Sequence, residues 1–314
     1  MNTTELRAST RRTFLKDLSL ATGLVCLGGS SLSAKESRLH LSSNSYSWNV
    51  YFSREKKNFD ADLDAGFAAL KASDIDGFEP GISSVQQLET MAPLLQKHQV
   101  ELPSIYCSSA LHEKAEAEKS SANILAIAKK AKTLGTRIVV TNPNPIRWGG
   151  PENKTDAQLR LQAGALNDLG REIAKLGVKL AYHNHDLELR NAAREFHHMM
   201  CGTAPEHVTL CLDAHWVYRG SGNSEVAMLD VLQLYGARIS ELHLRQSTSQ
   251  VWSETFGEGD LDYGAVVRHL VRIHQSPLLV MEQACEAGTP NTLQAVEIFR
   301  RSADYARRLF APLA

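Results

Sequence analysis

The sequence has no excess of charge of either sign. Its 314 residues include 34 Lys and Arg against 35 Asp and Glu, which gives a formal net charge of −1. A protein that holds nucleic acid or an anionic membrane surface through its overall charge needs a basic excess. The composition therefore argues against both partners. With 43% hydrophobic and 22% charged residues, the sequence is typical of a soluble globular protein with a sizeable core.

Several motifs are also missing. No GxGxxG follows any short apolar run, which weakens the case for a dinucleotide-binding fold. The five cysteines show no CxxC spacing, which argues against a structural zinc site. No linker or shift in composition divides the chain after its N-terminal segment. A single domain therefore accounts for most of the sequence.

The N-terminal segment has the pattern of an export signal. Residues 10–16 (TRRTFLK) form a twin-arginine motif, an apolar stretch runs from 18 to about 27, and mostly small residues follow. The apolar stretch is too short to span a bilayer, so we expect a cleaved signal peptide over residues 1–34 and no stable membrane insertion. The mature domain is then 35–314, exported by the twin-arginine machinery to the periplasm. This machinery carries folded proteins.

Short apolar runs alternate with amphipathic patterns along the mature chain. The predicted strands are residues 39–48, 75–79, 102–107, 137–141, 178–183, 208–213, 239–244 and 278–282. The predicted helices are residues 59–71, 85–95, one that ends at 134, 155–176, 196–200, 226–232, 263–273 and 293–309. Eight such units, each of roughly 30 residues, predict an α/β fold of the (β/α)8 TIM barrel type as a single domain. A doubly wound open sheet is the alternative.

Polar residues that could bind a metal follow several of these strands. The stretch 182–186 (YHNHD) ends the fifth strand, and Asp213, His243 and Glu282 end three later ones. The active site of such a barrel lies at the C-terminal ends of its strands, and a carboxylate buried there is costly without a cation. We therefore predict a metal site formed by one histidine of the fifth strand together with Asp213, His243 and Glu282. Either His183 or His185 fits; His185 is assigned as the ligand and His183 as a catalytic group.

Other polar and aromatic residues near strand ends are candidates for contact with substrate. Glu79 after the second strand fits a metal ligand, a hydrogen-bond acceptor or a general base, and a turn residue is the structural alternative. Arg245 shares a strand face with His243 and could steady a carbonyl or hydroxyl oxygen. Asn142 and His215 could contact a substrate hydroxyl, although a turn hydrogen bond explains each as well. Trp216 could stack on a sugar face.

The predicted ligands also indicate the class of metal and of reaction. Mixed histidine and carboxylate ligands suit Mn2+, Zn2+, Co2+ or Fe2+ better than Ca2+. Such a cation binds adjacent oxygens of a polyol and stabilises the negative charge that develops when a base removes a proton next to a carbonyl. Glu282 or a histidine could serve as the base.

The sequence motifs at these strand ends, taken in this order, resemble those of a known family. The sequence is similar to the xylose-isomerase-like TIM barrels, the sugar phosphate isomerases/epimerases, over nearly all of the mature chain. The matching stretches are residues 46–47, 77–80, 182–186, 212–213, 243–244, 256–260 and 280–282, of which YHNHD is the most specific. The resemblance implies a divalent metal on Asp213, His243 and Glu282.

One departure from the family narrows the expected activity. Well-known epimerases of the family use a glutamate at the end of the fifth strand, whereas this sequence has His183 and His185. A histidine there is similar to the inosose-dehydratase-like and keto-sugar lyase-like branches. We expect a sugar isomerase, epimerase, dehydratase or lyase acting on a sugar or keto-glycoside. The alternatives are a non-catalytic periplasmic sugar-binding protein and, less in keeping with the neutral charge, an abasic-site endonuclease-like metal nuclease. The oligomeric state stays open.

Overall fold

The computed structural model describes residues 38–314. The proposed signal peptide, residues 1–34, and its twin-arginine motif lie outside these described residues. Within residues 38–314, no helix combines the length and the apolar character needed to cross a membrane.

Eight parallel strands form the centre of the fold. Their order in the sheet is β2-β1-β10-β7-β6-β5-β4-β3. Isolated parallel bridges between Gly77 and Glu101 and between Gly81 and Tyr106 join the two edges, so the barrel is nearly closed. The predicted (β/α)8 TIM barrel is confirmed. The barrel strands are β1 (Leu41–Asn44), β2 (Gly77–Glu79), β3 (Ser104–Tyr106), β4 (Ile138–Thr141), β5 (Lys179–His183), β6 (Val208–Asp213), β7 (Ile239–Leu244) and β10 (Leu278–Met281).

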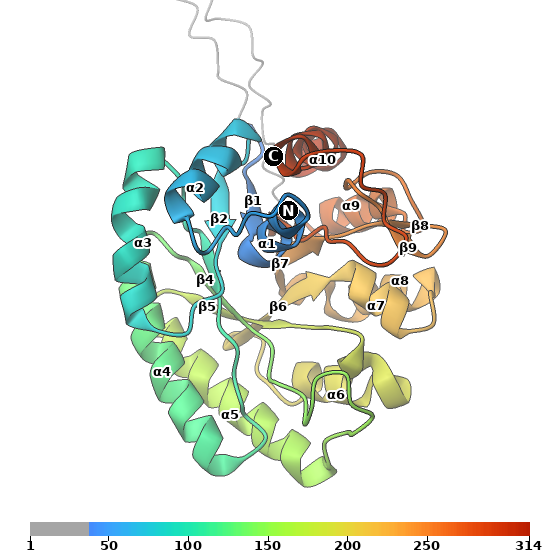
Figure 1. Cartoon of the computed structure of the whole chain (residues 1–314). Coiled ribbons are helices and arrows are strands. Elements are labelled where there is room, and N and C mark those ends of the chain that lie inside the picture. The colour runs from blue at the N-terminus through green and yellow to red at the C-terminus, as the bar shows by residue number, and fades with distance from the viewer. Residues whose placement is uncertain (1–37) are drawn as a thin grey trace, which may run out of the picture. The chain divides into compact units, whose positions relative to one another are not determined.

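Helices surround the ring of strands (Figure 1). They are α1 (Ser45–Arg54), α2 (Leu63–Ala72), α3 (Val85–His98), α4 (Lys114–Lys132), α5 (Asp156–Ala174), α6 (Arg190–Cys201), α7 (Ala214–Gly220), α8 (Glu225–Tyr235), α9 (Tyr263–Arg272) and α10 (Ala295–Phe310). Three 3-10 turns, η1 (Leu187–Leu189), η2 (Gly236–Arg238) and η3 (Ala311–Leu313), extend the connections. A small antiparallel hairpin of β8 (Ser247–Thr248) and β9 (Val251–Trp252) lies between β7 and α9.

The alternation of side chains along each strand separates the outer core from the inside of the barrel. Leu212 on β6 belongs to the large cluster that packs the strands against the helices. Its neighbour Cys211 belongs to a separate small cluster that also contains Ala181 of β5. Asp213 and His183 lie two residues beyond Cys211 and Ala181, so they share the inward face. The same alternation of side chains directs polar groups from several strands into the mouth of the barrel.

The strand predicted over residues 39–48 is wrong in its second half. β1 ends at Asn44 and α1 begins at Ser45. The side chain of Asn44 caps this helix, because its Oδ1 accepts a hydrogen bond from the backbone N–H of Ser47 at 3.0 Å. Trp48, the predicted strand end, is therefore a fully buried helix residue.

Two further helical segments differ from the prediction. The short helix expected over residues 196–200 is part of α6, which begins at Arg190 and includes three consecutive residues with positive φ, Asn191, Ala192 and Ala193. The helix α7, directly after β6, was not expected. It begins because the Asp213 side chain accepts a hydrogen bond from the backbone N–H of Trp216 at 2.8 Å.

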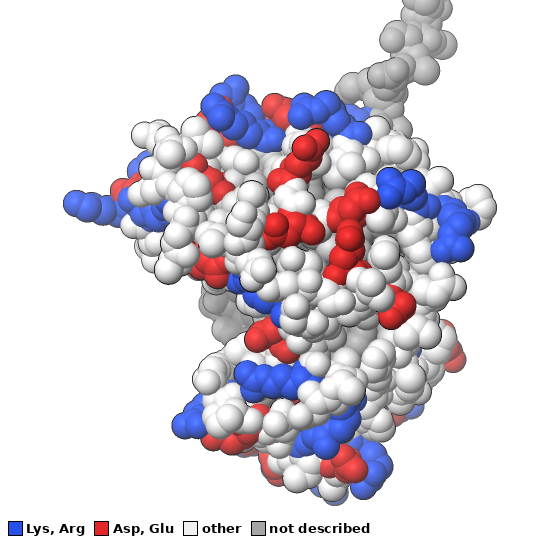
Figure 2. All heavy atoms as spheres, turned by 90° about the vertical axis from the view of Figure 1, so that its right-hand side faces the viewer, with Lys and Arg blue, Asp and Glu red and all other residues white. Residues whose placement is uncertain are grey.

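Charged side chains of both signs are interspersed over the face shown in Figure 2. No continuous basic stretch covers this face of the described chain. The view agrees with the formal net charge of −1.

Candidate active site

The register of the sheet brings the predicted strand ends together. Asp213 on β6 is paired with His243 on β7, and His183 on β5 is paired with Cys211 on β6. On the other side of β7, His243 is paired with Val280 of β10, so Glu282 lies two residues further along the same inward face. Four neighbouring strands therefore direct their polar groups to one side of the barrel mouth.

Three of these groups lie close enough to share a metal ion. His183, Asp213 and Glu282 each offer one ligand atom, and these atoms all lie within 4.8 Å of one another. All three side chains are buried. The two oxygens of Asp213 have different roles. Oδ1 caps α7, whereas Oδ2 has no hydrogen-bond partner among the described residues and is available to a metal. The arrangement of one nitrogen and two oxygen donors fits a divalent transition metal.

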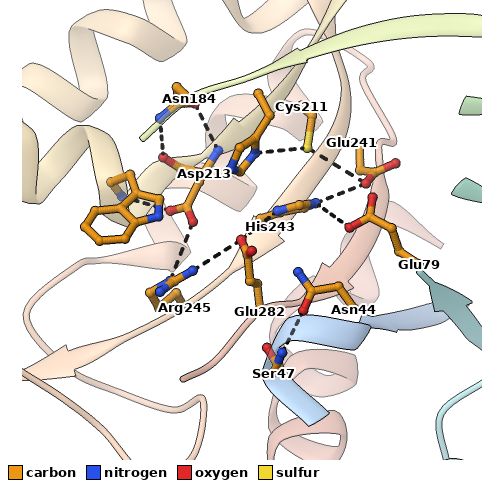
Figure 3. Close-up of polar contacts among 12 residues, drawn as sticks. Asn44, Ser47, Glu79, Asn184, Cys211, Asp213, Glu241, His243, Arg245 and Glu282 are labelled. Carbon is orange, nitrogen blue, oxygen red and sulfur yellow. Dashed lines mark hydrogen bonds and ion pairs between the residues drawn. The ribbon is translucent and has the colours of Figure 1, made fainter. Parts of the chain in front are cut away.

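His243 lies at the centre of the polar network (Figure 3). Its Nδ1 is 2.7 Å from Oε2 of Glu282, and its ring centroid is 4.7 Å from that of His183. Its Nε2 faces the opposite way, 3.1 Å from Oε1 of Glu241 and 3.2 Å from Oε1 of Glu79. One nitrogen of His243 therefore lies beside the candidate metal ligands, and the other lies between two buried carboxylates.

His185 lies outside the group of three potential ligands. Its ring is 4.8 Å from that of His183 and 5.2 Å from that of Trp148, and it lines the cavity at the barrel mouth. Burial lowers the pKa of His185 to about 4, so the ring is neutral near pH 7. The structure thus brings His183, rather than the predicted His185, next to Asp213 and Glu282.

Arg245 is the buried arginine of the site. Its Nη2 is 3.3 Å from Oε2 of Glu282, and its Nε is 3.6 Å from Oδ2 of Asp213. The guanidinium packs against the rings of Trp216 and Trp252, at 4.9 and 4.5 Å from their centroids, and the two rings contact each other edge to face. Its Nη1 is buried without a hydrogen-bond partner in this part of the chain, so it can still donate to a ligand.

The site contains four buried carboxyl groups, and if all four were ionised Arg245 alone could not offset their charge. Glu79, Asp213 and Glu241 are fully buried, and Glu282 is 6% exposed. Burial raises the pKa of Asp213 to about 7. Burial also acts to raise the pKa of Glu282, but His243 and Arg245 hold it well below its usual range. Burial and the neighbouring Glu79 raise the pKa of Glu241 well above its usual range. Four ionised carboxylates beside Arg245 and His243 are costly without a further cation, so the residues present fit a bound divalent metal.

The other predicted substrate contacts divide into two classes. Trp216 lines the cavity, as does Glu79, whose Oε2 accepts a hydrogen bond from Ser104 at 3.3 Å. Asn142 is instead a framework residue, because it donates to the backbone oxygen of His183 at 2.8 Å. His215 is similarly engaged, with its Nε2 2.9 Å from Oγ of Ser247. Neither Asn142 nor His215 is among the residues that line the cavity.

The cavity at the barrel mouth has a volume of about 560 Å³. This volume is within the range of roughly 300–1,000 Å³ typical of small-molecule sites. A hollow of similar size, about 550 Å³, lies between α4 and α5, away from the strand ends and their convergent polar groups. The lining of the cavity at the mouth includes Tyr46, Glu79, Trp148, Trp216, Arg245 and Glu282. Aromatic side chains next to charged ones suit a ligand that has apolar ring faces as well as hydroxyl groups.

Two buried polar residues of this region were missed by the sequence analysis. Glu241 contacts His243, and it precedes His243 by two residues on the same strand, so its inward direction follows from alternation. Glu188 accepts hydrogen bonds from the backbone N–H of His185 at 2.7 Å and from Asn142 at 3.1 Å. Nothing in the local sequence pattern distinguishes Glu188 from a surface residue, because it lies in the irregular segment after β5.

Asn184 aligns the ends of β5 and β6. Its side chain exchanges two hydrogen bonds with the backbone of Asp213, donating to the carbonyl oxygen at 3.1 Å and accepting from the N–H at 3.2 Å. Asn184 is fully buried, so these backbone groups have no access to water. The alternation within YHNHD thus directs His183 into the barrel and uses Asn184 to fix the neighbouring strand.

Comparison with known proteins extends these observations. The family model described as "Xylose isomerase-like TIM barrel" matches residues 67–309. An inosose dehydratase from Clostridium botulinum (strain Alaska E43 / Type E3) is 23% identical over 247 residues, which are 69% of this chain and 80% of that protein. An inosose dehydratase from Bacillus velezensis is 27% identical over 157 residues, 44% of this chain and 51% of that protein.

Solved structures share the fold at low sequence identity. A sugar phosphate isomerase/epimerase from Parabacteroides distasonis has a TM-score of 0.68 and 15% identity, with 91% of this chain and 98% of that chain covered. A 3-keto-D-glucoside 4-epimerase from E. coli has a TM-score of 0.61 and 14% identity, with 86% and 100% covered. At such identities the similarity concerns the fold alone.

Proposed function

Because this chain belongs to the family of xylose isomerase-like TIM barrels, we propose that it is a divalent-metal-dependent enzyme that removes a proton next to a carbonyl of a sugar or keto-glycoside. The observation that carries the proposal is the convergence of His183, Asp213 and Glu282, with His243 beside them, on one side of the cavity. Separate strands supply these groups, so their meeting is a property of the fold.

We assign His183, Asp213, His243 and Glu282 as the residues that hold the metal. Their mixed nitrogen and oxygen donors suit Mn2+, Zn2+, Co2+ or Fe2+. When bound, such a cation stabilises the negative charge that develops on substrate oxygens. This assignment exchanges the roles first given to the two histidines of β5, because His183 is the one that lies with Asp213 and Glu282.

The carboxylates that line the cavity are the candidate bases. Glu282 or Glu79 takes the proton from the carbon next to the carbonyl, and the electron pair of the broken C–H bond moves toward the carbonyl oxygen. Return of a proton gives an isomer or an epimer, whereas departure of an oxygen on the next carbon gives elimination. Arg245, with a free N–H, is placed to donate to a substrate oxygen. His185 and Trp216 contact the substrate from the walls.

The substrate class follows from the cavity and from the relatives. The names of the relatives refer to inososes and to a 3-keto-glucoside, all of which carry a ketone beside ring hydroxyls. Exposed aromatic rings at the mouth, Tyr46 at 47% and Trp148 at 56%, are available to stack on a sugar or aglycone. We also propose that the mature enzyme acts in the periplasm, since the twin-arginine motif in residues 10–16 fits export; fractionation of cells that express the full chain tests this.

The reaction is tested by incubating the metal-loaded protein with a panel of sugars and 3-keto-glycosides in D2O. Deuterium uptake without fragmentation identifies isomerisation or epimerisation, and release of water or of the aglycone identifies a lyase. Binding of panel members with neither deuterium uptake nor product identifies a sugar-binding protein and contradicts the enzyme proposal.

The ligand assignment on β5 gives a specific prediction. We expect His183→Gln to weaken metal binding by more than the roughly 10–100-fold typical of losing an outer-shell partner, because a direct ligand is removed. His185→Gln is the matched control, with the same change two residues along, and it should retain the metal. Competition with a fluorescent chelator measures both affinities. The opposite pattern would assign the metal to His185.

A further inference from the structure

We propose that Glu241 is a positioning residue that accepts a hydrogen bond from Nε2–H of His243 and thereby presents Nδ1 of that ring to the metal. The inference rests on the proposed metal site and adds a residue to it. Glu241 lies on β7, two residues before His243, at the point where β7 is paired with both β6 and β10. Its side chain is fully buried.

The geometry of His243 carries the argument. Its two ring nitrogens face different groups: Nδ1 is 2.7 Å from Glu282, and Nε2 is 3.1 Å from Glu241. A neutral imidazole holds one proton, and the hydrogen bond made by one nitrogen decides whether the other has a free lone pair. The 2.7 Å between Nδ1 and Oε2 of Glu282 is a hydrogen-bond distance, so Nδ1–H donates to Glu282 before a metal binds. A metal that displaces this proton takes the lone pair of Nδ1, while the hydrogen bond to Glu241 keeps the other proton on Nε2. If the neutral ring kept its proton on Nδ1, that nitrogen would have no lone pair with which to bind a metal.

Glu241 is better placed for this role than Glu79, which also lies near Nε2. Glu79 lines the cavity and has a second partner, the hydroxyl of Ser104. Glu241 does not line the cavity, and its other polar neighbours in the described chain are the thiol of Cys211, with Sγ 3.8 Å from Oε1, and the carboxyl group of Glu79. Its second oxygen, Oε2, has no hydrogen-bond partner in this part of the chain. A carboxylate buried with so few partners is retained most simply because it orients His243.

The alternative explanation is a second cation held directly by Glu79, Glu241 and His243, whose ligand atoms also lie within 4.8 Å of one another. We favour the positioning role because the charges of the site already balance with one metal ion. A divalent ion (+2), Arg245 (+1) and one bound proton (+1) offset the four negative charges of the carboxylates. In addition, a second ion on Nε2 would require His243 to give up its only proton if Nδ1 also binds a metal. The experiment below separates the two explanations.

The test uses the full metal-free chain loaded with Co2+, whose visible absorption reports its coordination. Removing the acceptor in Glu241→Leu should weaken Co2+ binding by about 10–100-fold and alter the absorption bands. Glu241→Gln should restore most of the affinity, because its amide oxygen can accept the same hydrogen bond. Glu254→Leu is the control, since Glu254 is buried but binds Thr292 and Leu293 outside the barrel mouth, and it should match the unmodified protein in Co2+ affinity.

Three outcomes overturn the proposal. Unchanged affinity and spectrum in Glu241→Leu show that Glu241 does not act through His243. Two Co2+ per unmodified chain, with one lost in Glu241→Leu, identify Glu241 as a direct ligand. No Co2+ binding by the unmodified chain contradicts the proposed function itself, and the inference with it.

A measurement on the unmodified protein removes the dependence on variant folding. In the Zn2+-loaded chain, nitrogen chemical shifts should show His243 protonated on Nε2 and bound through Nδ1. Protonation on Nδ1 contradicts the proposal whatever the variants do.

Discussion

Replacing Glu282 with glutamine is expected to lower kcat by roughly 10³-fold, because the substitution removes a general base and also weakens one of the four assigned metal ligands. Glu282 contacts both His243, at 2.7 Å, and Arg245, at 3.3 Å, and it lines the cavity. These neighbours keep its pKa low despite burial, so the side chain is an ionised carboxylate near pH 7. An amide of the same shape carries no charge and cannot accept a proton.

The measurement is the initial rate on the substrate identified by the deuterium experiment, together with the affinity for that substrate. An enzyme loses turnover in Glu282→Gln, whereas a sugar-binding protein has no turnover to lose and keeps its affinity. Glu286→Gln is the matched control, because Glu286 follows four residues later and binds Arg219 instead of the site. Activity in Glu282→Gln equal to that of the control would exclude Glu282 as the base.

Removal of divalent cations is expected to abolish activity completely and to lower the Tm. Without a metal ion, the four carboxyl groups of the site have only Arg245 and His243 beside them to offset their charge. A metal at 100 times its Kd adds about 2.7 kcal/mol to the free energy of unfolding, which corresponds to roughly 5 °C or more in Tm for a domain of this size. Mn2+, Co2+, Zn2+ and Fe2+ should differ in how well they restore the rate.

Thermal unfolding and activity are measured on chelator-treated protein before and after each cation is added. Asp213→Asn provides the control, because the asparagine can still cap α7 through its side-chain oxygen but lacks the charge that binds a metal. Its Tm should not respond to cations. Full activity after exhaustive chelation, or an equal rise in Tm for Asp213→Asn, would contradict the metal site.

The barrel and most of its strand ends could be predicted from the sequence because both depend on short-range patterns. Apolar runs separated by amphipathic helices specify parallel strands, and a carboxylate directly after such a run, as at Asp213 and Glu282, must lie at a strand end. The first strand was the exception. Asn44 ends it by capping a helix, and a cap has no signature within an extended run of serines and aromatics.

The distribution of roles within the site could not be predicted in the same way. Alternation places His183 and His185 on one face, but only the distance to Asp213 and Glu282 shows which ring lies with the carboxylates. Asn142 and His215 followed strand ends as a substrate contact would, yet their side chains bind neighbouring protein groups.

The sequence by itself thus determined the type of fold, the residues offered at the strand ends and the class of metal that their chemistry suits. Periodicity and residue type carry this information locally. The tertiary structure alone decided which histidine meets the carboxylates, that Glu241 contacts Nε2 of His243, and that Arg245 packs against both Trp216 and Trp252. Apart from Glu241 and His243, which share β7, these contacts join residues from different elements, and the curvature of the sheet sets the distances between the strand ends.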